Sequence, residues 1–332
     1  MTYLVFAASA VLVAVAGVLA ARYGDVIAVR TQLGRFLFGT LLLAAGTSLP
    51  ELASAFNAIA SGVPDLAAGN LLGSILVNML ALALVDLFSR QRLLLHRLAI
   101  NHALTAALAV LMIATALFFI LLPPGGLLGR LHVDSLLLVL LFLAGIRLVQ
   151  FQARRVPMVG PLPAPGRQPT LRGAIVGFAL AVVLLLLATP VLVNSARGVA
   201  ELTGLGVGFI GVALFPLITA TPEFASSIAA VRIGAFDLAV GNLFGSCVFN
   251  IFALAAAGFL QPGESLFAAI SPGFEVVGIL GLVLISIALL GTLAPAESRV
   301  LGIEWDALLI IVTYLAGVYL LFRQGLLQAA RG

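Results

Sequence analysis

The 332-residue sequence has little charge, no lysine and a single cysteine. Charged residues make up 9% of the chain, whereas 62% of its residues are hydrophobic. A water-soluble fold could not cover that much apolar surface with so little polar surface, so the composition indicates an integral membrane protein. The lone cysteine, Cys247, excludes an internal disulfide and a metal site built from several thiolates.

The sequence also lacks the motifs of several function classes. Its three histidines share no metal-ligand spacing, and it has no zinc-protease motif, nucleophile elbow or phosphate-binding loop. All 17 basic residues are arginines, and they do not gather with aromatic residues into a nucleic-acid surface. We therefore expect no enzyme activity, no cofactor and no nucleic-acid partner.

Apolar segments of about 20 residues, long enough to cross a bilayer, recur along the whole chain. They lack the alternating pattern of barrel strands, which predicts helices. The fold class is therefore an all-α integral membrane protein of ten transmembrane helices. The predicted spans are 2–21, 36–61, 66–88, 98–122, 132–152, 172–196, 206–232, 237–260, 270–292 and 305–323.

The spans divide into two halves, residues 1–152 and 172–332, joined by a Pro-rich linker at 153–171. Because each half has five spans, an odd number, the second half enters the membrane from the opposite side. The two five-helix repeats are therefore inverted. The linker is too short for a separate regulatory domain.

Arginines gather in the loops that follow the first, third and fifth spans; Arg22, Arg30 and Arg35 are expected in the first of these loops. The positive-inside rule makes these loops and the linker cytoplasmic, with both termini outside the cytoplasm. The first span lacks the positive n-region of a signal peptide, so it is interpreted as mature structure. We expect a multi-pass protein of the cell membrane, in contact with the lipid bilayer. Its oligomeric state is not predicted.

Residues 39–78 and 211–250 align without a gap at an offset of 172 residues, with 18 identities in 40 positions. The copies share polar residues and helix breakers, while the apolar positions differ. Such a duplicated pair of interrupted hydrophobic segments is the sequence pointer to the binding site of a secondary transporter.

Each copy places a glutamate near the middle of a span, Glu51 in the first and Glu223 in the second. An ionisable side chain at that depth costs at least about 2.5 kcal/mol, which favours a functional role over a simple interhelical hydrogen bond. The preceding residue in each copy, Pro50 or Pro222, lacks an N–H, so each helix is expected to open just before its glutamate. Exposed carbonyls and threonine hydroxyls beside a carboxylate suit hard cations.

Each copy also carries a polar stripe at i, i+4 and i+8, which is one face of a helix. The stripes are Asn70, Ser74 and Asn78, and Asn242, Ser246 and Asn250. For Ser74, Ser246, Asn78 and Asn250 we favour a share in ion coordination, whereas Asn70 and Asn242 are either ligands or hydrogen bonds between helices. Neighbouring glycines would let each stripe approach another backbone closely. Asp65 and Asp237 are expected to be helix N-caps.

The segments GTSLPEL at 46–52 and PDLAAGNLLGS at 64–74 resemble the first alpha repeat of the sodium/calcium exchanger family, in the cation/calcium antiporter superfamily. TPEF at 221–224 and DLAVGNLFGS at 237–246 resemble the second alpha repeat. The resemblance implies an antiporter that exports Ca²⁺ against Na⁺ entry, with ions bound at the midplane. By family analogy, the first and sixth spans form a sliding pair.

The resemblance also implies ligand roles. Glu51 and Glu223 would be central ligands for Ca²⁺ and Na⁺, and Thr47 and Thr219 would offer backbone carbonyls. The carbonyl of Ala44 with Ser48 and Ser74 would form an inner sodium site, while Ser246 would belong to an outer one and Asn78 and Asn250 would flank the middle.

The second copy departs from this pattern, because Ala220 replaces the equivalent of Ser48 and Pro216 that of Ala44. The two sodium sites are therefore expected to differ, which leaves the coupling ion open. The prediction is alternating-access antiport of Ca²⁺ and Na⁺, two carboxylates matching one dication. H⁺/Ca²⁺ exchange is the alternative, and a non-transporting membrane sensor or scaffold is an alternative of another class.

Overall fold

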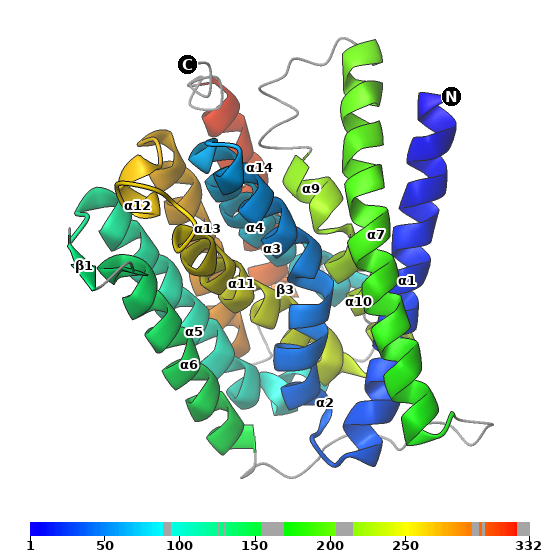
Figure 1. Cartoon of the computed structure of the whole chain (residues 1–332). Coiled ribbons are helices and arrows are strands. Elements are labelled where there is room, and N and C mark those ends of the chain that lie inside the picture. The colour runs from blue at the N-terminus through cyan, green and yellow to red at the C-terminus, as the bar shows by residue number, and fades with distance from the viewer. Residues whose placement is uncertain are drawn as a thin grey trace.

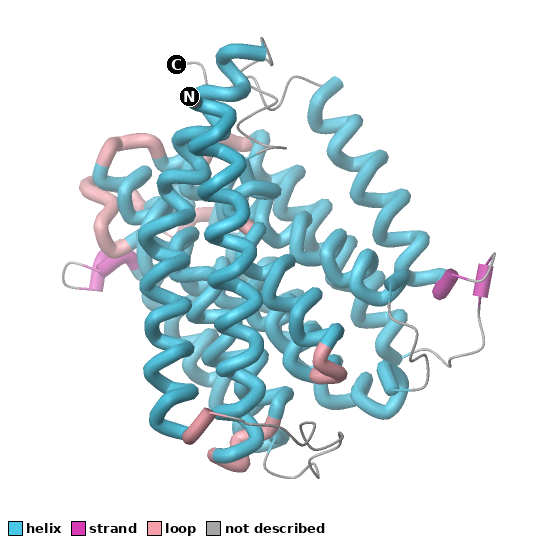
Figure 2. The backbone as a smooth tube through the Cα atoms, turned by 90° about the vertical axis from the view of Figure 1, so that its right-hand side faces the viewer, coloured by secondary structure: helices cyan, strands magenta, loops and turns pink. Residues whose placement is uncertain are grey.

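The computed structural model describes residues 1–88, 94–124, 126–128, 131–153, 169–203, 215–293, 299–300 and 303–323. Nearly all of these residues are helical, and the described strands form two antiparallel hairpins of two-residue strands (Figure 1). The beginning of α1 and the end of α14 lie at the same end of the helix bundle, as an even number of crossings requires (Figures 1 and 2).

The first half contains one long helix, a segmented helix and three further helices. Its elements are α1 (Thr2–Arg30), α2 (Arg35–Leu37), the π-helix η1 (Phe38–Leu43), α3 (Ala44–Ala60), α4 (Pro64–Phe88), α5 (Leu94–Leu121), β1 (Leu127–Leu128), β2 (Leu131–His132) and α6 (Val133–Ala153).

The second half repeats this order. Its elements are α7 (Leu171–Thr203), α9 (Phe215–Thr219), α10 (Thr221–Arg232), α11 (Phe236–Gly258), α12 (Leu266–Ala269), α13 (Gly273–Leu293), β3 (Arg299–Val300), β4 (Ile303–Glu304) and α14 (Trp305–Arg323).

The 172-residue offset extends far beyond the 40 aligned positions. Each strand of the β1–β2 hairpin has its counterpart in the β3–β4 hairpin at that offset, and the ends of α5 and α13, Leu121 and Leu293, also differ by 172. Gly62 and Gly234, again 172 apart, take positive φ values of 71° and 76° in the turns before α4 and α11. The structural repeat therefore spans both halves of the chain.

The equivalent helices α1 and α7 pack side by side and run antiparallel (Figure 1). Gly198 lies against Thr2 near one end of the pair, and Gly177 lies against Tyr23 near the other. Since two helices at equivalent places in the repeat point in opposite directions, the repeats are inverted, as predicted.

Nine helical segments within the described ranges are long and apolar enough to cross a membrane, which agrees with the predicted fold class. The remaining predicted span, 206–232, contains α9 and α10, but its residues 206–214 lie outside the described ranges, as do linker residues 154–168. Helix α1 continues to Arg30, so the prediction that Arg22 lies in a loop was wrong. The apolar run ends near Ala21, but the helix continues past the charged residues at its end.

The proline-glutamate segments behave differently in the two repeats. Helix α3 continues through Pro50, so the predicted opening there was wrong, whereas the second copy is interrupted at Ala220 between α9 and α10. One proline removes a single backbone hydrogen bond, which a packed helix tolerates. The second copy has a further proline, Pro216, six residues before Pro222. Its helix is interrupted between α9 and α10.

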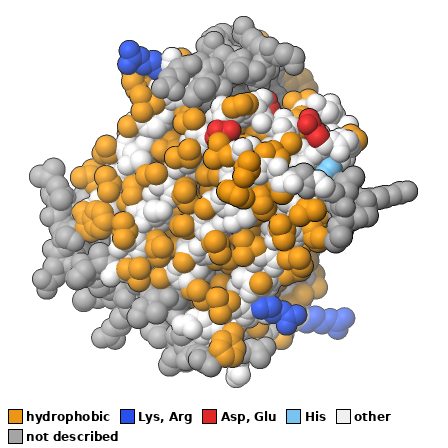
Figure 3. Space-filling view, turned by 90° about the vertical axis from the view of Figure 1, so that its left-hand side faces the viewer, with side chains coloured by type: hydrophobic (Ala, Val, Ile, Leu, Met, Phe, Trp, Pro, Cys, Tyr) orange, Lys and Arg blue, Asp and Glu red, His pale blue; other side chains and the backbone are white. Residues whose placement is uncertain are grey.

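Helices α4 and α11 are the most buried of the candidate spans, whereas α6 and α14 are the most exposed to the surroundings. On the face shown in Figure 3, hydrophobic side chains cover the middle and charged side chains lie toward the edges. This distribution fits a protein surrounded by hydrocarbon at mid-height. It also leaves α4 and α11, with their polar stripes, at the centre.

Candidate functional site

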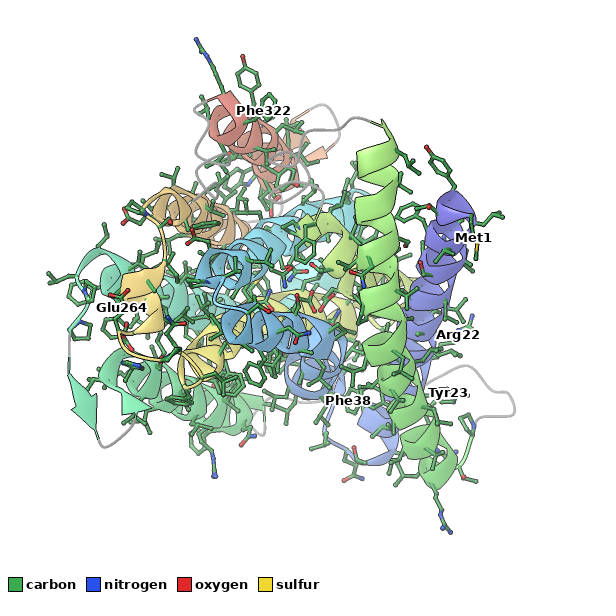
Figure 4. All side chains as sticks on the ribbon, turned by 45° about the horizontal axis from the view of Figure 1, so that its top comes forward. Met1, Arg22, Tyr23, Phe38, Glu264 and Phe322 are labelled. Carbon is green, nitrogen blue, oxygen red and sulfur yellow. The ribbon has the colours of Figure 1, made fainter. Side chains whose placement is uncertain are left out.

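All ten predicted site residues lie on the helical segments α3, α4, α9, α10 and α11, and each is at most 1% exposed. They are Ala44, Thr47, Ser48, Glu51, Ser74, Asn78, Thr219, Glu223, Ser246 and Asn250. In Figure 4, side-chain oxygens are visible in the middle of the bundle, while the labelled Met1, Glu264 and Phe322 lie at its periphery.

The two glutamates are close enough to interact electrostatically, but their hydrogen bonding differs. Ser48 Oγ donates to Glu223 Oε1 over 2.7 Å, which joins α3 to α10. Neither carboxylate oxygen of Glu51 has a hydrogen-bond partner among the described residues, and Glu223 Oε2 also has none. The residue at 220 is alanine, so the second repeat offers Glu51 no hydroxyl equivalent to that of Ser48.

Further buried oxygens near the middle of α4 and α11 lack partners within the described part of the chain. They are Asn78 Oδ1, Ser246 Oγ and Asn250 Oδ1. A buried polar atom without a partner costs about 1 to 3 kcal/mol, so atoms retained in this state are candidates for binding something else. Two carboxylates with several neutral oxygens form a donor set suited to Ca²⁺ or Na⁺.

Two hydrogen bonds cross between the repeats in the same way. Thr47 Oγ1 of α3 lies 3.3 Å from Asn242 Oδ1 of α11, and Thr219 Oγ1 of α9 lies 2.9 Å from Asn70 Oδ1 of α4. Each asparagine therefore meets the threonine of the other repeat. This geometry supports hydrogen bonding between helices, one of the two interpretations of Asn70 and Asn242. Ser74 Oγ lies 3.4 Å from Thr219 Oγ1 in the same region.

Two serines that the sequence did not single out complete the contacts of Asn242. Its Nδ2 lies 3.0 Å from Ser226 Oγ, 3.1 Å from Ser227 Oγ and 3.3 Å from the backbone oxygen of Glu223. Ser226 is one turn beyond Glu223 and is repeated in the first copy, which is the signal that could have identified it. In the first copy Ala55 replaces the equivalent of Ser227.

Glycines let α11 approach η1 at backbone distance, as expected from the small residues beside the stripe. A Cβ atom added at Gly245 would clash with the backbone oxygen of Thr40, and one at Gly241 would lie 3.0 Å from the Thr40 nitrogen. A side chain at either position would push the two helical segments apart. The polar face of α11 is thereby held against the first repeat.

The prediction that Asp65 and Asp237 cap helices was wrong. Both lie within the first turn of their helices, and their side chains reach across to the other half. Asp65 accepts hydrogen bonds from the nitrogen and hydroxyl of Ser271, at 2.8 and 2.5 Å, while Asp237 Oδ1 lies 2.9 Å from His102 Nε2. These contacts tie each half to the other near the two ends of the site helices.

The antiparallel pair α1 and α7 covers the site helices on one side. A Cβ atom at Gly17 of α1 would lie 2.9 Å from the backbone oxygen of Pro222, next to Glu223. Figure 4 labels Tyr23 and Phe38 in the region where α1, α7 and η1 meet, and Phe38 makes an edge contact with Phe178 of α7. Helix α1 therefore contacts the segment that holds Glu223 directly.

Comparison with protein families gives one match over most of the chain. A family model described as sodium/calcium exchanger protein matches residues 1–149 and 173–323. The matched ranges include every residue of the candidate site.

Curated relatives match at lower coverage. The inner membrane protein YrbG of Escherichia coli (strain K12) is 28% identical over 260 residues, which is 74% of this chain and 76% of the relative. The protein named "Putative antiporter CaxA" of Alkalimonas amylolytica is 29% identical over 248 residues, 71% of this chain and 74% of the relative.

Among solved structures, the sodium-calcium exchanger NCX_Mj soaked with 100 mM Na⁺ and 10 mM Sr²⁺ is similar with a TM-score of 0.71. The match covers 96% of this chain and 99% of that one at 20% identity. The same exchanger soaked without Na⁺ and Ca²⁺ gives a TM-score of 0.70. At this level of identity the likeness shows that the two proteins share a fold.

Proposed function

The chain belongs to the sodium/calcium exchanger protein family, and from this premise we propose that it exports Ca²⁺ in exchange for Na⁺ at a site between Glu51 and Glu223. Members of the family are transporters, so the chain is a multi-pass cation/Ca²⁺ antiporter and not an enzyme. Its substrates are Ca²⁺ and a monovalent cation.

The observation that carries this proposal is the state of the two glutamates. Both are about 1% exposed, and three of their four carboxylate oxygens have no hydrogen-bond partner among the described residues. Two ionised carboxylates in a low-dielectric interior are unfavourable unless a cation neutralises them. One Ca²⁺ balances two carboxylates, and monovalent ions can replace it.

This charge balance explains why transport would be an exchange. A site without cations would carry two bare negative charges through the change of access, which is energetically costly. The protein therefore switches sides with Ca²⁺ or with the replacing ions bound. In the proposal, α1 and α7 slide over the site helices while the site stays near the midplane.

The remaining predicted residues have proposed ligand roles around this pair. The backbone carbonyls of Thr47 and Thr219 and the amides of Asn78 and Asn250 would join the glutamates in the centre. The carbonyl of Ala44, Ser48 and Ser74 would hold sodium on one side, and Ser246 on the other.

Purified protein in liposomes tests the function directly. An outward Na⁺ gradient, with no pH gradient, should drive uptake of radioactive calcium, and removing Na⁺ should stop it. Glu51→Gln and Glu223→Gln, each confirmed to fold by its elution as a single species, should abolish the uptake. Calcium uptake that continues unchanged without Na⁺ would rule out sodium coupling.

Proton coupling is the second candidate, and the Glu51 carboxylate, for which the described ranges offer no hydrogen-bond partner, favours it. Because Ala220 gives Glu51 no hydroxyl partner, a proton is one way to neutralise that side chain after Ca²⁺ leaves. A pH gradient alone should then drive calcium uptake, with Na⁺ absent. Uptake under neither gradient, combined with Ca²⁺ binding by purified protein, would favour the non-transporting sensor.

We further propose that the protein lies in the cell membrane with both termini outside the cytoplasm. The arginine distribution supports this orientation, and the relative YrbG is named as an inner membrane protein. Reporter fusions at the C-terminus test it: a reporter active only outside the cytoplasm should give signal. A signal only from a cytoplasmic reporter would reverse the assignment.

A further inference from the structure

We propose that Asn242 and Asn70 are positioning residues that control whether a backbone carbonyl in the other repeat is free to bind the coupling ion. Each would do so by accepting the hydroxyl hydrogen bond of a threonine, Thr47 or Thr219. This inference rests on the proposed cation site, because the carbonyls in question belong to Ala44 and Pro216.

The chemistry starts from the single hydroxyl proton of each threonine. Thr47 Oγ1 lies 3.1 Å from the oxygen of Leu43, 3.2 Å from that of Ala44 and 3.3 Å from Asn242 Oδ1. The hydroxyl can direct its proton to one of these acceptors at a time. When the proton points to Asn242, the carbonyls of Leu43 and Ala44 keep their lone pairs for a cation.

The same choice exists in the second repeat. Thr219 Oγ1 lies 2.9 Å from Asn70 Oδ1 and 3.2 Å from the oxygens of both Phe215 and Pro216. The asparagine is the nearest of the three acceptors here. Both repeats therefore place an asparagine of the opposite half in competition with a carbonyl of the threonine's own helix.

The orientation of the Asn242 amide follows from its other contacts. The backbone oxygen of Glu223 can only accept a hydrogen bond, so the amide nitrogen faces it. Ser226 Oγ donates its own proton to that same backbone oxygen and can accept from the Asn242 amide. With Nδ2 fixed on this side, Oδ1 faces Thr47.

The first repeat lacks this anchor. Asn70 Nδ2 is buried and has no partner among the described residues, and Ala55 replaces the equivalent of Ser227. The Asn70 amide is therefore held by Thr219 alone among the hydrogen bonds described for it. We expect Asn242 to act on both Thr47 and the Glu223 segment, and Asn70 to act on Thr219.

Paired substitutions across the repeats test the proposal. Asn242→Leu removes the acceptor, so Thr47 turns its proton toward its own helix and the sodium concentration for half-maximal effect should rise about 5-fold to 10-fold. Thr47→Val removes the competing proton. The double variant Asn242→Leu with Thr47→Val should therefore recover at least half of the lost sodium affinity on a logarithmic scale. Thr47→Ser, which keeps the hydroxyl, should behave like the wild type.

The opposite repeat supplies a matched control. Thr219→Val should suppress the effect of Asn70→Leu, whereas Thr47→Val should not, because Thr47 meets Asn242 instead. If the asparagines had a purely structural role, each added substitution would weaken sodium binding further. The proposal would be overturned if the losses were additive in both hydrogen-bonded pairs, Asn242 with Thr47 and Asn70 with Thr219. It would also be overturned if Thr47→Val suppressed the effect of Asn70→Leu as strongly as Thr219→Val does.

The readout separates this inference from the proposed function. The sodium dependence is measured by Na⁺-induced thermal stabilisation of the purified protein as well as by calcium uptake in liposomes. If the wild type binds Na⁺ but does not exchange it for Ca²⁺, the proposed function fails while crossed suppression of Na⁺ binding still supports the positioning role. If the wild type is stabilised by Ca²⁺ and not by Na⁺, the positioning of a sodium ligand is overturned.

Discussion

Glu51 in the first repeat and Glu223 in the second occupy matching places, yet among the described residues only Glu223 receives a side-chain hydrogen bond from a serine of the opposite repeat. Ser48 provides that bond, and its counterpart Ala220 cannot. A charge supported by a buried hydroxyl is less dependent on a bound ion than an unsupported one. The comparison therefore implies that Glu51 depends on a bound cation more than Glu223 does.

The helices that hold the two glutamates also differ. Helix α3 is continuous through Pro50, whereas the second copy is divided at Ala220 into α9 and α10. Asn242 anchors the segment around Glu223 through Ser226 and Ser227, whereas the Asn70 amide nitrogen has no partner in the described part of the chain. Among the described residues, the interrupted α9–α10 segment thus has hydrogen bonds that have no counterpart at the continuous helix α3.

The largest expected effect comes from removing either central charge. Glu51→Gln and Glu223→Gln should each weaken Ca²⁺ binding at least about 100-fold, or about 2.7 kcal/mol, because one carboxylate no longer balances a dication. Calcium titration of the purified variants measures this. Equal losses would mean that the Ser48 hydrogen bond does not distinguish the two sites, and an unchanged affinity in both variants would place the calcium site elsewhere.

Exchanging the hydroxyl between the repeats should have a smaller effect. Ser48→Ala removes a proposed sodium ligand and should weaken Na⁺ binding about 5-fold to 10-fold, or about 1 to 1.4 kcal/mol. Ala220→Ser should strengthen sodium binding by making the second repeat resemble the first. The Na⁺ dependence of thermal stabilisation checks both variants, with Ser61→Ala, at an exposed position just after the end of α3, as a control.

Contact between α1 and the Glu223 segment should matter for the rate of transport. Gly17→Ala would put a methyl group 2.9 Å from the Pro222 oxygen, so α1 would slide less freely and the maximal transport rate should fall about 3-fold to 10-fold. The calcium concentration for half-maximal uptake should stay within about 2-fold. Gly24→Ala, whose methyl group would meet the Phe38 ring instead, is the matched control; an equal loss of rate there would remove the special role of Gly17.

The smallest expected effect falls where the repeats agree. Gly62 and Gly234 have positive φ values and no atom within 4 Å of an added Cβ, so alanine would cost backbone strain alone. Gly62→Ala and Gly234→Ala should each destabilise the protein by about 1 kcal/mol, which thermal unfolding in detergent can measure. A difference above about 1 kcal/mol between the two would show that these turns are not equivalent.

Much of the site could be predicted from the sequence, because a glutamate, serine or asparagine in the middle of an apolar span is conspicuous. The repeat then identified Glu51 with Glu223 and Ser74 with Ser246 without any knowledge of packing. The helix opening at Pro50 and the caps at Asp65 and Asp237 could not be predicted correctly. A proline or an aspartate has several local outcomes, and the partners that decide among them come from distant parts of the chain.

The sequence by itself determined the membrane environment, the two repeats and the depth of the glutamates, since these follow from the order and hydrophobicity of neighbouring residues. Only the tertiary structure decided that Ser48 meets Glu223, that Thr47 meets Asn242 and that Thr219 meets Asn70. The physical reason is that these pairs depend on how closely and in what register helices from opposite repeats pack. Hydrogen bonds of about 3 Å are sensitive to that register, which hydrophobic periodicity along one chain does not specify.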